Sequence, residues 1–265
     1  MQKAQRRHKY LTDTARDLGF VSISEAAEHL GVSRETVRRD INKLVGSGAL
    51  LKVRGGATTA KPTMRRDAVY RKRASSNVDE RLSLGKCAAE MITDGAIVEL
   101  DCGVCAMSVA SAVRDVRGVT FVTNSLPTAS ILLNKIEHGT LDGRVIFLGG
   151  ELDTLNRSTR GAMTVSELQK YYFDIAFISC TSINEDSVSS YTLDECFYSA
   201  ELLRRSSVSV LLALSEKAWK SSLYSYASPT DFDRIIIDDT HKLPPALTEA
   251  LAGRSTELIV VRGDD

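Results

Sequence analysis

Apolar residues recur at helical spacing in the N-terminal part of the chain. Val37, Ile41 and Leu44 lie at i, i+4 and i+7, so the sequence predicts an amphipathic helix that buries this stripe. Ser33 precedes the stripe and has the side chain of a helix N-cap. The polar side chains that then lie opposite the stripe or on its flank are Arg34, Glu35, Thr36, Arg38, Arg39 and Asn42.

The segments around this helix predict a winged helix-turn-helix. We expect a shorter helix with Ser24 as its N-cap, ending at Gly31, because glycine adopts the left-handed conformation easily. Residues 6–18 predict an earlier helix that packs against the other two. Leu50–Val53 followed by Arg54-Gly55-Gly56 predicts a β-hairpin with a basic tip. In such a unit the second helix enters the DNA major groove, and the hairpin reaches a phosphate or the minor groove.

The rest of the chain has a different pattern. The spacing of Leu82, Leu84 and Ala88 predicts a helix within residues 79–92. Beyond it, short β-branched runs alternate with helical stretches, which predicts an α/β domain whose largely parallel sheet is covered by helices on both faces. The expected strands are residues 96–100, 119–123, 145–148, 175–179, 208–214, 234–237 and 258–261.

These patterns divide the chain into three parts. We expect a winged helix-turn-helix domain in residues 1–57, a linker in residues 58–75, and an effector-sensing and oligomerisation domain in residues 76–265. The linker is predicted because the sequence ATTAKPTMRRDAVYRKR is polar, contains Pro62 and lacks apolar periodicity.

Charge is divided along the chain as well. The formal net charge is zero, with 34 Lys and Arg against 34 Asp and Glu. Residues 1–73 hold 17 basic and 7 acidic side chains, which leaves 17 and 27 for residues 74–265, so the two parts carry +10 and −10. A local basic excess favours binding to nucleic acid, because neutralised phosphates release their counterions. We therefore expect the N-terminal part alone to bind DNA.

The cysteine and histidine residues limit which disulfides and metal sites the chain can form. Five cysteines, an odd number, do not make a disulfide framework, so reduced thiols are expected. Cys102 and Cys105 have the spacing of redox and metal motifs, but no second pair stands at ligand spacing, so we expect no metal and no cofactor.

No apolar run approaches the roughly 18 residues of a membrane span, and MQKAQRRHKYL lacks the apolar core of a signal peptide. The expected location is the cytoplasm.

Three loops follow predicted strands at the edge where parallel sheets bind ligands. Residues 101–105 precede a helix, whose N-terminal N–H groups can hold an anion. Residues 123–125 and 149–151 follow the next two strands, and a glycine such as Gly149 or Gly150 permits close approach of a ligand to the backbone. The sequence therefore predicts a ligand site formed by these loops.

Several of these segments resemble one known family. The runs VSRETVRRDINKL and VRGGA are similar to the DNA-binding domain of the DeoR family of bacterial regulators of sugar metabolism. DCGVC, VTNSL, FLGGEL and the stretch 193–217 resemble the effector-sensing domain of that family. The resemblance covers nearly the whole chain, and the N-terminal motifs are the more specific ones.

The resemblance implies a site and a ligand. In this family the sensing domain is similar in fold to ribose-5-phosphate isomerase and glucosamine-6-phosphate deaminase, and it senses a phosphorylated sugar. Lys217 would pair with the phosphate or a carboxylate, and Glu195 would accept hydrogen bonds from sugar hydroxyls. The residues that the family pattern implies around the effector are Asp101, Gly103, Asn124, Gly149, Gly150, Glu195 and Lys217.

The sequence departs from the family pattern in four places. Val104 and Cys105 stand where hydroxyl side chains are usual, so two donors to a phosphate are missing. A segment that is usually rich in glycine reads Ser179-Cys180-Thr181-Ser182, the usual aspartate is Leu214, and the usual glycine is Trp219. Either the effector is less anionic or bulkier than a sugar phosphate, or sensing is reduced.

Taken together, the sequence predicts a transcriptional regulator that is not an enzyme. Its expected role is repression of a carbohydrate-utilisation operon, and its expected partners are double-stranded operator DNA, a phosphorylated sugar and further copies of itself, with no membrane. Two alternatives stay open. One is an enzyme similar to sugar-phosphate isomerases, using Asp101, Glu195 and Lys217, and the other is a redox-sensing regulator that uses Cys102 and Cys105.

Overall fold

The computed structural model describes residues 3–18, 20–53, 55–59, 70, 73–219 and 222–262. The chain forms two compact units, residues 1–73 and residues 74–265. Most of the predicted linker, like Arg54, lies outside the described residues.

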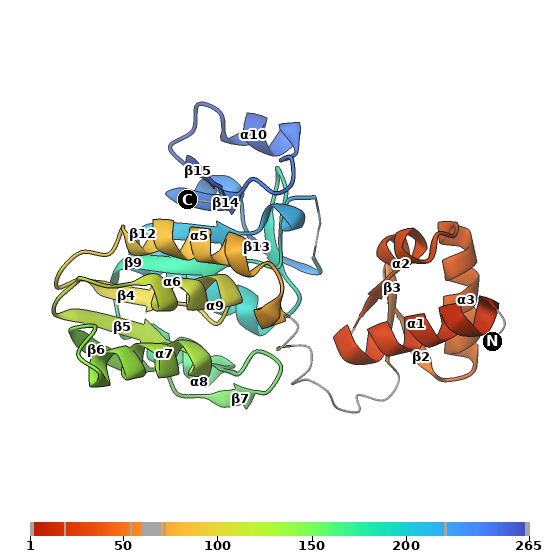
Figure 1. The fold of residues 1–265 in the computed structure, drawn as a ribbon, viewed down its shortest axis with the longest axis horizontal. Helices are drawn as coiled ribbons and strands as arrows, with labels where there is room; N and C mark the ends of the chain where they lie inside the picture. The colour runs from red at the N-terminus through yellow and green to blue at the C-terminus, as the bar shows by residue number, and fades with distance from the viewer. Residues whose placement is uncertain are drawn as a thin grey trace. The chain divides into compact units, whose positions relative to one another are not determined.

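The N-terminal unit is a winged helix-turn-helix, as the sequence predicted (Figure 1). Its elements are α1 (Lys3–Leu18), β1 (Val21–Ser22), α2 (Ile23–Leu30), α3 (Arg34–Gly46), β2 (Leu50–Val53) and β3 (Gly56–Thr59). The predicted hairpin is formed by β2 and β3, and β1 adds a short third strand against β3 that the sequence did not reveal. The core contains Leu11, Val37, Ile41 and Leu50, so the predicted apolar stripe of α3 is buried.

One predicted helix start is wrong. Ser24 lies inside the first turn of α2, and the N-cap is Ser22, whose Oγ accepts a hydrogen bond from the N–H of Glu25 at 3.4 Å. Ser22 also belongs to β1, so its extended backbone is fixed by the sheet, and that places the cap two residues earlier. Two other expected boundaries are confirmed. Ser33 caps α3, and Gly31 ends α2 with a φ of 62°.

The C-terminal unit is an α/β domain built on one seven-stranded sheet. The helices and strands in chain order are α5 (Val78–Ala89), β4 (Ile97–Leu100), α6 (Val104–Ala112), β5 (Val119–Thr123), α7 (Leu126–Glu137), β6 (Gly143–Phe147), β7 (Glu151–Asp153), β8 (Ser158–Arg160), α8 (Ala162–Leu168), β9 (Phe173–Ser179), β10 (Ser182–Ile183), β11 (Val188–Ser190), α9 (Leu193–Arg205), β12 (Ser206–Ala213), β13 (Tyr224–Ala227), β14 (Arg234–Asp238), α10 (Pro245–Leu251) and β15 (Glu257–Val261). Two single 3-10 turns, Ser215–Lys217 and Pro229–Asp231, follow β12 and β13.

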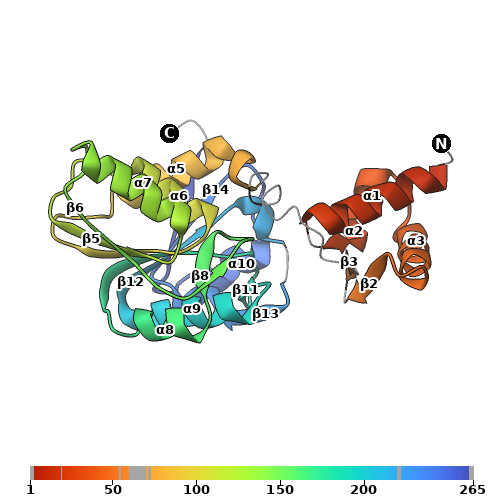
Figure 2. The ribbon, with the colours of Figure 1, turned by 90° about the horizontal axis from the view of Figure 1, so that it is seen from below.

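All seven predicted strands lie in this sheet, in the order β15-β14-β12-β9-β4-β5-β6, and every neighbouring pair is parallel. Helices α5, α6 and α7 cover one face, and α8, α9 and α10 cover the other (Figure 2). This confirms the predicted α/β fold class. Two small antiparallel sheets, β7-β8 and β10-β11-β13, were not predicted from the sequence.

The helix expected within residues 79–92 is present as α5, and most of its expected apolar residues are buried, but one of them is exposed. Leu82 is 43% exposed, whereas Arg81 is 4% exposed and donates to the backbone carbonyls of Ser76 and Ala74. A buried guanidinium is tolerated because these carbonyls accept its hydrogen bonds. A pattern of apolar residues alone does not reveal such a contact.

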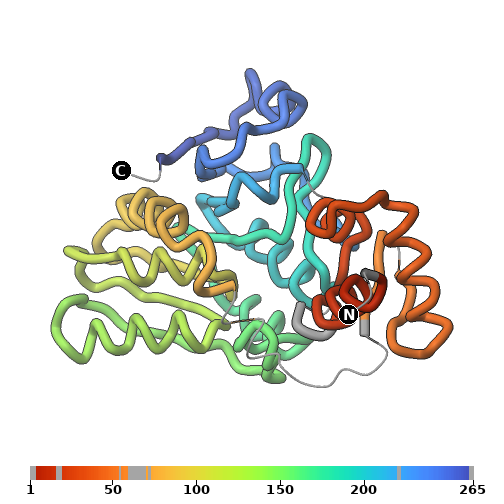
Figure 3. Tube along the Cα trace, turned by 45° about the vertical axis from the view of Figure 1, so that its right-hand side comes forward, coloured from red at the N-terminus to blue at the C-terminus, as the bar shows by residue number. Residues whose placement is uncertain are grey.

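Strand order brings distant segments of the chain together (Figure 3). The central strand β4 pairs with β9 on one side and with β5 on the other, and β9 also pairs with β12. Because all of these strands run in the same direction, their following loops meet at one edge of the sheet. None of the helices in the described parts of the chain combines the length and the apolarity needed to span a lipid bilayer.

Candidate functional site

Helix α3 presents a polar surface opposite its buried stripe. Ser33 caps the helix, with its Oγ accepting from the N–H of Thr36 at 3.2 Å, and Thr36 is partly buried. The remaining residues predicted to contact DNA and described by the structure are all exposed: Arg34, Glu35, Arg38, Arg39 and Asn42.

Three contacts order this surface. Glu35 accepts a hydrogen bond from Arg38 at 2.8 Å and lies 3.9 Å from the Nε of Arg39. Because these pairs are exposed, they hold the guanidinium groups only weakly, and both arginines can turn towards a nucleic acid. Lys52 of β2 donates to the Oδ1 of Asn42 at 3.2 Å and joins the hairpin to the helix. Lys52 was not singled out from the sequence, and only its basic character in the predicted hairpin pointed to it.

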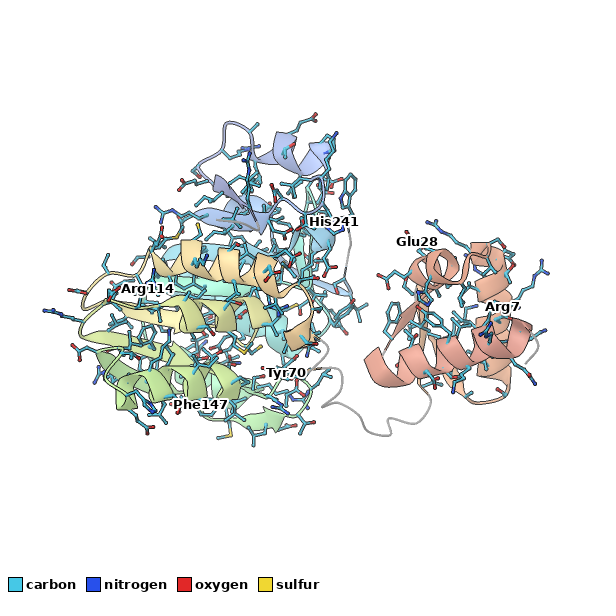
Figure 4. The ribbon with its side chains drawn as sticks, viewed as in Figure 1. Arg7, Glu28, Tyr70, Arg114, Phe147 and His241 are labelled. Atoms are coloured by element: carbon cyan, nitrogen blue, oxygen red, sulfur yellow. The ribbon has the colours of Figure 1, made fainter. Side chains whose placement is uncertain are left out.

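Helix α3, the recognition helix of the predicted DNA-binding unit, is anchored to α1 by a buried carboxylate. Asp40 is 4% exposed and accepts from the Nε of Arg7 at 2.6 Å and from the Nε2 of His8 at 2.9 Å (Figure 4 labels Arg7). Burial alone raises the pKa of Asp40, but the hydrogen bonds from Arg7 and His8 outweigh it and hold the pKa below its usual value. Because the pattern of α3 does not distinguish Asp40 from its exposed polar residues, this contact could not be predicted from the sequence.

We expect Asp40→Asn to loosen the contact between α1 and α3. Because the pKa of Asp40 is lower in the folded protein, the ionised carboxylate stabilises the fold above the ordinary pKa, and this stabilisation is lost as the pH falls through the folded pKa. Amide hydrogen exchange in α1 and α3 of the full chain is therefore expected to be faster in Asp40→Asn at neutral pH. Equal exchange rates in the variant and the parent protein would contradict a stabilising role.

In the C-terminal unit, Asp101 joins two loops at the edge of the sheet. It follows β4 and is 5% exposed. Its Oδ1 accepts from the N–H of Gly103 at 2.7 Å, and its Oδ2 accepts from the N–H of Ser179 at 2.8 Å. Burial raises the pKa of Asp101, although these N–H groups and the charge of Lys217 oppose the rise. The carboxylate therefore holds the first loop against the end of β9.

Two of the predicted glycines are required by close packing. A Cβ on Gly103 would lie 2.1 Å from the Oγ of Ser179, and a Cβ on Gly150 would lie 2.0 Å from the Oγ1 of Thr164. Gly150 also has a φ of 152°, which favours glycine. Gly149 is exposed, and a Cβ there would meet no atom within 4 Å. The close approach at Gly103 and Gly150 is thus made by the protein's own side chains.

Lys217 brings a cation to the same edge. It is partly buried, and its Nζ donates to the backbone carbonyl of Cys180 at 2.7 Å. Burial lowers the pKa of Lys217, but the negative charges of Glu216 and Asp101 act in the opposite direction, and the pKa lies above its usual value. The side chain is therefore an ammonium group at neutral pH.

The remaining two predicted residues contact the β7–β8 hairpin. Glu195, in the first turn of α9, accepts from the Nδ2 of Asn156 at 2.6 Å and from the Oγ of Ser190. Asn124 is buried, and its Nδ2 donates to the carbonyl of Thr159 at 2.9 Å. The hairpin between residues 151 and 160 thus links Asn124 to α9, a connection that the sequence did not reveal.

The thiols of the first loop are not activated. Burial, together with Asp101 and Glu195, raises the pKa of Cys102 well above its usual value, and burial also raises the pKa of Cys105. Both therefore remain protonated at neutral pH, which weighs against the redox alternative because the thiolate is the reactive form. In the described ranges, no group of three or more His, Cys, Asp or Glu is arranged to hold a metal ion.

The departures from the family pattern have distinct surroundings. Cys105 is fully buried in the apolar core between the sheet and α5 and α6, whereas Val104 is only partly buried. Leu214 is buried, and Trp219 is 60% exposed with its Nε1 donating to the carbonyl of Lys242 at 3.0 Å. Of the two positions that lack the family's usual hydroxyl, Val104 is therefore the one that a ligand can contact.

Comparison with known proteins accounts for both units. The family model for the DeoR C terminal sensor domain matches residues 76–239, and the model for the DeoR-like helix-turn-helix domain matches residues 7–63. An uncharacterised HTH-type transcriptional regulator of Staphylococcus epidermidis is 32% identical over 218 residues, which cover 82% of this chain and 85% of that protein. The lactose phosphotransferase system repressor of Staphylococcus aureus is 29% identical over 220 residues, which cover 83% of this chain and 86% of that protein.

A solved structure of ribose 5-phosphate isomerase A from Methanocaldococcus jannaschii is similar over 54% of this chain and 55% of that one, with 15% identity and a TM-score of 0.35. The two family models between them cover helix α3, six of the seven strands of the large sheet and the candidate loops at its carboxyl edge. The chain therefore belongs to the DeoR family of transcriptional regulators, with a DeoR-like helix-turn-helix domain followed by a DeoR sensor domain.

Proposed function

We propose that this regulator represses a carbohydrate-utilisation operon and releases its operator when a phosphorylated sugar binds to the C-terminal unit. The observation that carries the proposal is the placement of Lys217, Asn124 and the N-terminus of α6 at one edge of the parallel sheet, in a chain that also has an exposed recognition helix. The relative that is named a lactose phosphotransferase system repressor supports a role in sugar metabolism.

The proposed phosphate position lies between α6 and Lys217. Gly103 is the N-cap of α6 and supplies no side-chain hydrogen bond, so the first N–H groups of the helix are available to an anion. The Lys217 ammonium, which is close enough to Cys105 in the first turn of α6 to influence its pKa, adds a full positive charge. Glu195 and Asn124 then face the hydroxyl groups of the sugar.

The proposed coupling to DNA is a linkage of two binding equilibria. An effector that binds one arrangement of the subunits more tightly changes operator affinity by its differential binding free energy, typically about 1–3 kcal/mol. Helix-turn-helix proteins read paired half-sites as dimers, so the proposal includes a homo-oligomer.

The test begins with the operator. Selection of bound sequences from a random DNA pool defines it, and fluorescence anisotropy then measures its affinity for the full chain with and without phosphorylated sugars. We expect at least one sugar phosphate to weaken operator binding by roughly 5- to 150-fold. Operator affinity that no sugar changes would contradict the proposal. Turnover of any sugar in the same mixtures would instead favour the isomerase-like alternative.

The oligomeric state gives a further prediction. We expect the full chain to sediment as a dimer or a larger oligomer in analytical ultracentrifugation at micromolar concentration, because paired half-sites need two recognition helices. Addition of one operator duplex should then shift the whole population to a single complex with at least two chains per duplex. A strict monomer in both conditions would exclude this part of the proposal.

A further inference from the structure

The central strand of the sheet contains a buried carboxyl group that the proposed function does not use. Glu99 of β4 is 0% exposed. Its Oε1 accepts a hydrogen bond from the hydroxyl of Tyr198 on α9 at 2.7 Å. Its Oε2 is buried and has no hydrogen-bond partner among the described residues. A lone acidic residue with an unpaired oxygen in the middle of a sheet needs an explanation, since nearly all buried polar atoms in proteins are paired.

A second unpaired oxygen lies just beyond the end of the neighbouring strand β5. Side chains alternate along a strand, so Glu99 points away from the face that buries Val98 and Leu100 and towards the face covered by α9. Glu99 pairs in register with Val122 of β5, and Asn124 follows two residues later. The Oδ1 of Asn124 is also buried without a partner among the described residues, although its Nδ2 is bound to Thr159.

These oxygen atoms adjoin the proposed effector residues. Asp101 is close enough to Glu99 to influence its pKa, and Glu99 and Glu195 are both close enough to Cys102 to influence the pKa of its thiol. Tyr198, which binds Glu99, stands one helical turn after Glu195 on α9. The two unpaired oxygens therefore come from neighbouring segments of the sheet that also carry the proposed effector residues Asp101 and Asn124.

We propose that Glu99 is a specificity-determining residue of the effector site, whose unpaired oxygen, together with that of Asn124, accepts hydrogen bonds from a hydroxyl or ammonium group of the bound sugar. This inference rests on the proposed function and adds to it the orientation of the ligand. The carboxylates of Asp101 and Glu195 repel a phosphate, so the phosphate lies at the Lys217 end and the donor groups of the sugar lie at the Glu99 end.

The protonation state of Glu99 suits such a ligand. Burial, and then the charge of Asp101, raises the pKa of Glu99 well above its usual value, against the hydrogen bond from Tyr198. The groups that face Glu99 from the neighbouring elements are Asp101, Cys102 and Tyr198. The raised pKa favours the neutral acid, which can accept from a sugar hydroxyl and also donate to it. An ammonium group would ionise it and release a proton.

The experiment measures selectivity in the full chain. Isothermal titration calorimetry compares glucose 6-phosphate and galactose 6-phosphate with analogues that lack one hydroxyl each, and with glucosamine 6-phosphate. In the parent protein we expect one missing hydroxyl to weaken binding by about tenfold or more, because it leaves the acceptors of the site unpaired. Proton release on binding of glucosamine 6-phosphate, measured in two buffers, distinguishes the ammonium ligand from the hydroxyl ligand.

The decisive variant is Glu99→Gln. Glutamine has the same shape and keeps an oxygen for Tyr198, but it places an N–H2 donor where the unpaired oxygen was. We expect the penalty for the missing hydroxyl to fall to about twofold or less. If Glu99→Gln does not fold, Glu99→Asp is the second variant, because it keeps the carboxyl group but shortens the side chain by one methylene. It should also reduce the loss of affinity that the missing hydroxyl causes.

The control is Tyr198→Phe, which removes the hydrogen bond to Glu99 but retains the carboxyl group. We expect it to lower the melting temperature and to preserve the preference among sugars. If a sugar phosphate binds and both Glu99 variants keep the parent preference, the inference is overturned while the proposed function stands. If no sugar in the series binds, the proposed function fails, and the inference fails with it.

Discussion

Replacing Arg39 by alanine is expected to lower operator affinity by roughly 1–3 kcal/mol, or about 5- to 150-fold, while the fold is preserved. Arg39 lies on the face of α3 opposite the buried residues Val37 and Ile41, and its side chain is 76% exposed. Its contact with Glu35 is 3.9 Å long, so little is lost in the free protein when the guanidinium is removed. On DNA, an arginine at this position can donate two hydrogen bonds to guanine, which alanine cannot replace.

Fluorescence anisotropy with the selected operator measures this loss, and Arg114→Ala is the matched control. Arg114 carries the same charge, is 85% exposed, and belongs to the C-terminal unit (Figure 4). If affinity falls equally in both variants, net charge rather than base contact explains the loss. If Arg39→Ala binds the operator as tightly as the parent protein, Arg39 does not belong to the DNA interface.

Sequence patterns predicted what depends on local periodicity. The stripe of Val37, Ile41 and Leu44, and the alternation of β-branched runs with helices, follow from the need of each element to bury one side. These patterns were sufficient for the recognition helix and for every strand of the large sheet. They also indicated which loops lie at its carboxyl edge, because parallel strands place those loops together.

Contacts between distant segments were not predictable in this way. Asp40, Arg81 and Glu99 are all buried although each is a charged residue type. Asp40 and Arg81 have hydrogen-bond partners outside their own helices, and Glu99 has such a partner for one of its two carboxyl oxygens. A buried polar group is tolerated only with such a partner, and the pattern of neighbouring residues does not identify it. The same reason explains the contact of Glu195 with Asn156, which depends on a hairpin too short to be recognised from its sequence.

The resemblance to the DeoR family contributed the candidate effector residues, and the structure separates their surroundings. Gly103 and Gly150 are needed where the Ser179 and Thr164 side chains approach the backbone, and Asp101 joins two loops. These residues build the edge of the sheet. Lys217 is the member of the set with a cationic side chain, so the nature of the ligand is best tested there.

Replacing Lys217 by methionine is expected to weaken binding of a phosphorylated sugar by about tenfold or more, because a charge-assisted hydrogen bond contributes roughly 1.5–3 kcal/mol. Methionine keeps the length of the aliphatic side chain, so the change removes the ammonium and little packing. Lys217→Arg should restore part of the affinity. The control is Lys170→Met, which removes an exposed cation that precedes β9 at the opposite edge of the sheet.

A second change tests the missing hydroxyl. Val104→Thr replaces a partly buried methyl group by a hydroxyl at the start of α6, and it is expected to tighten binding of a sugar phosphate severalfold. Cys105 is a poorer choice, because its side chain is buried in the apolar core. Together the two variants should move phosphosugar affinity in opposite directions and leave the binding of the unphosphorylated sugar unchanged.

The rival hypothesis is that the loss of the family's usual hydroxyls reflects a ligand without a phosphate. Calorimetric titration of each variant with a sugar phosphate and with the same sugar unphosphorylated separates the two views. An anionic ligand requires that Lys217→Met reduce the preference for the phosphorylated form, since the ammonium interacts with the phosphate alone. If the parent protein prefers the uncharged sugar and Lys217→Met keeps that preference, the phosphate site does not exist, and Lys217 serves only to hold the carbonyl of Cys180.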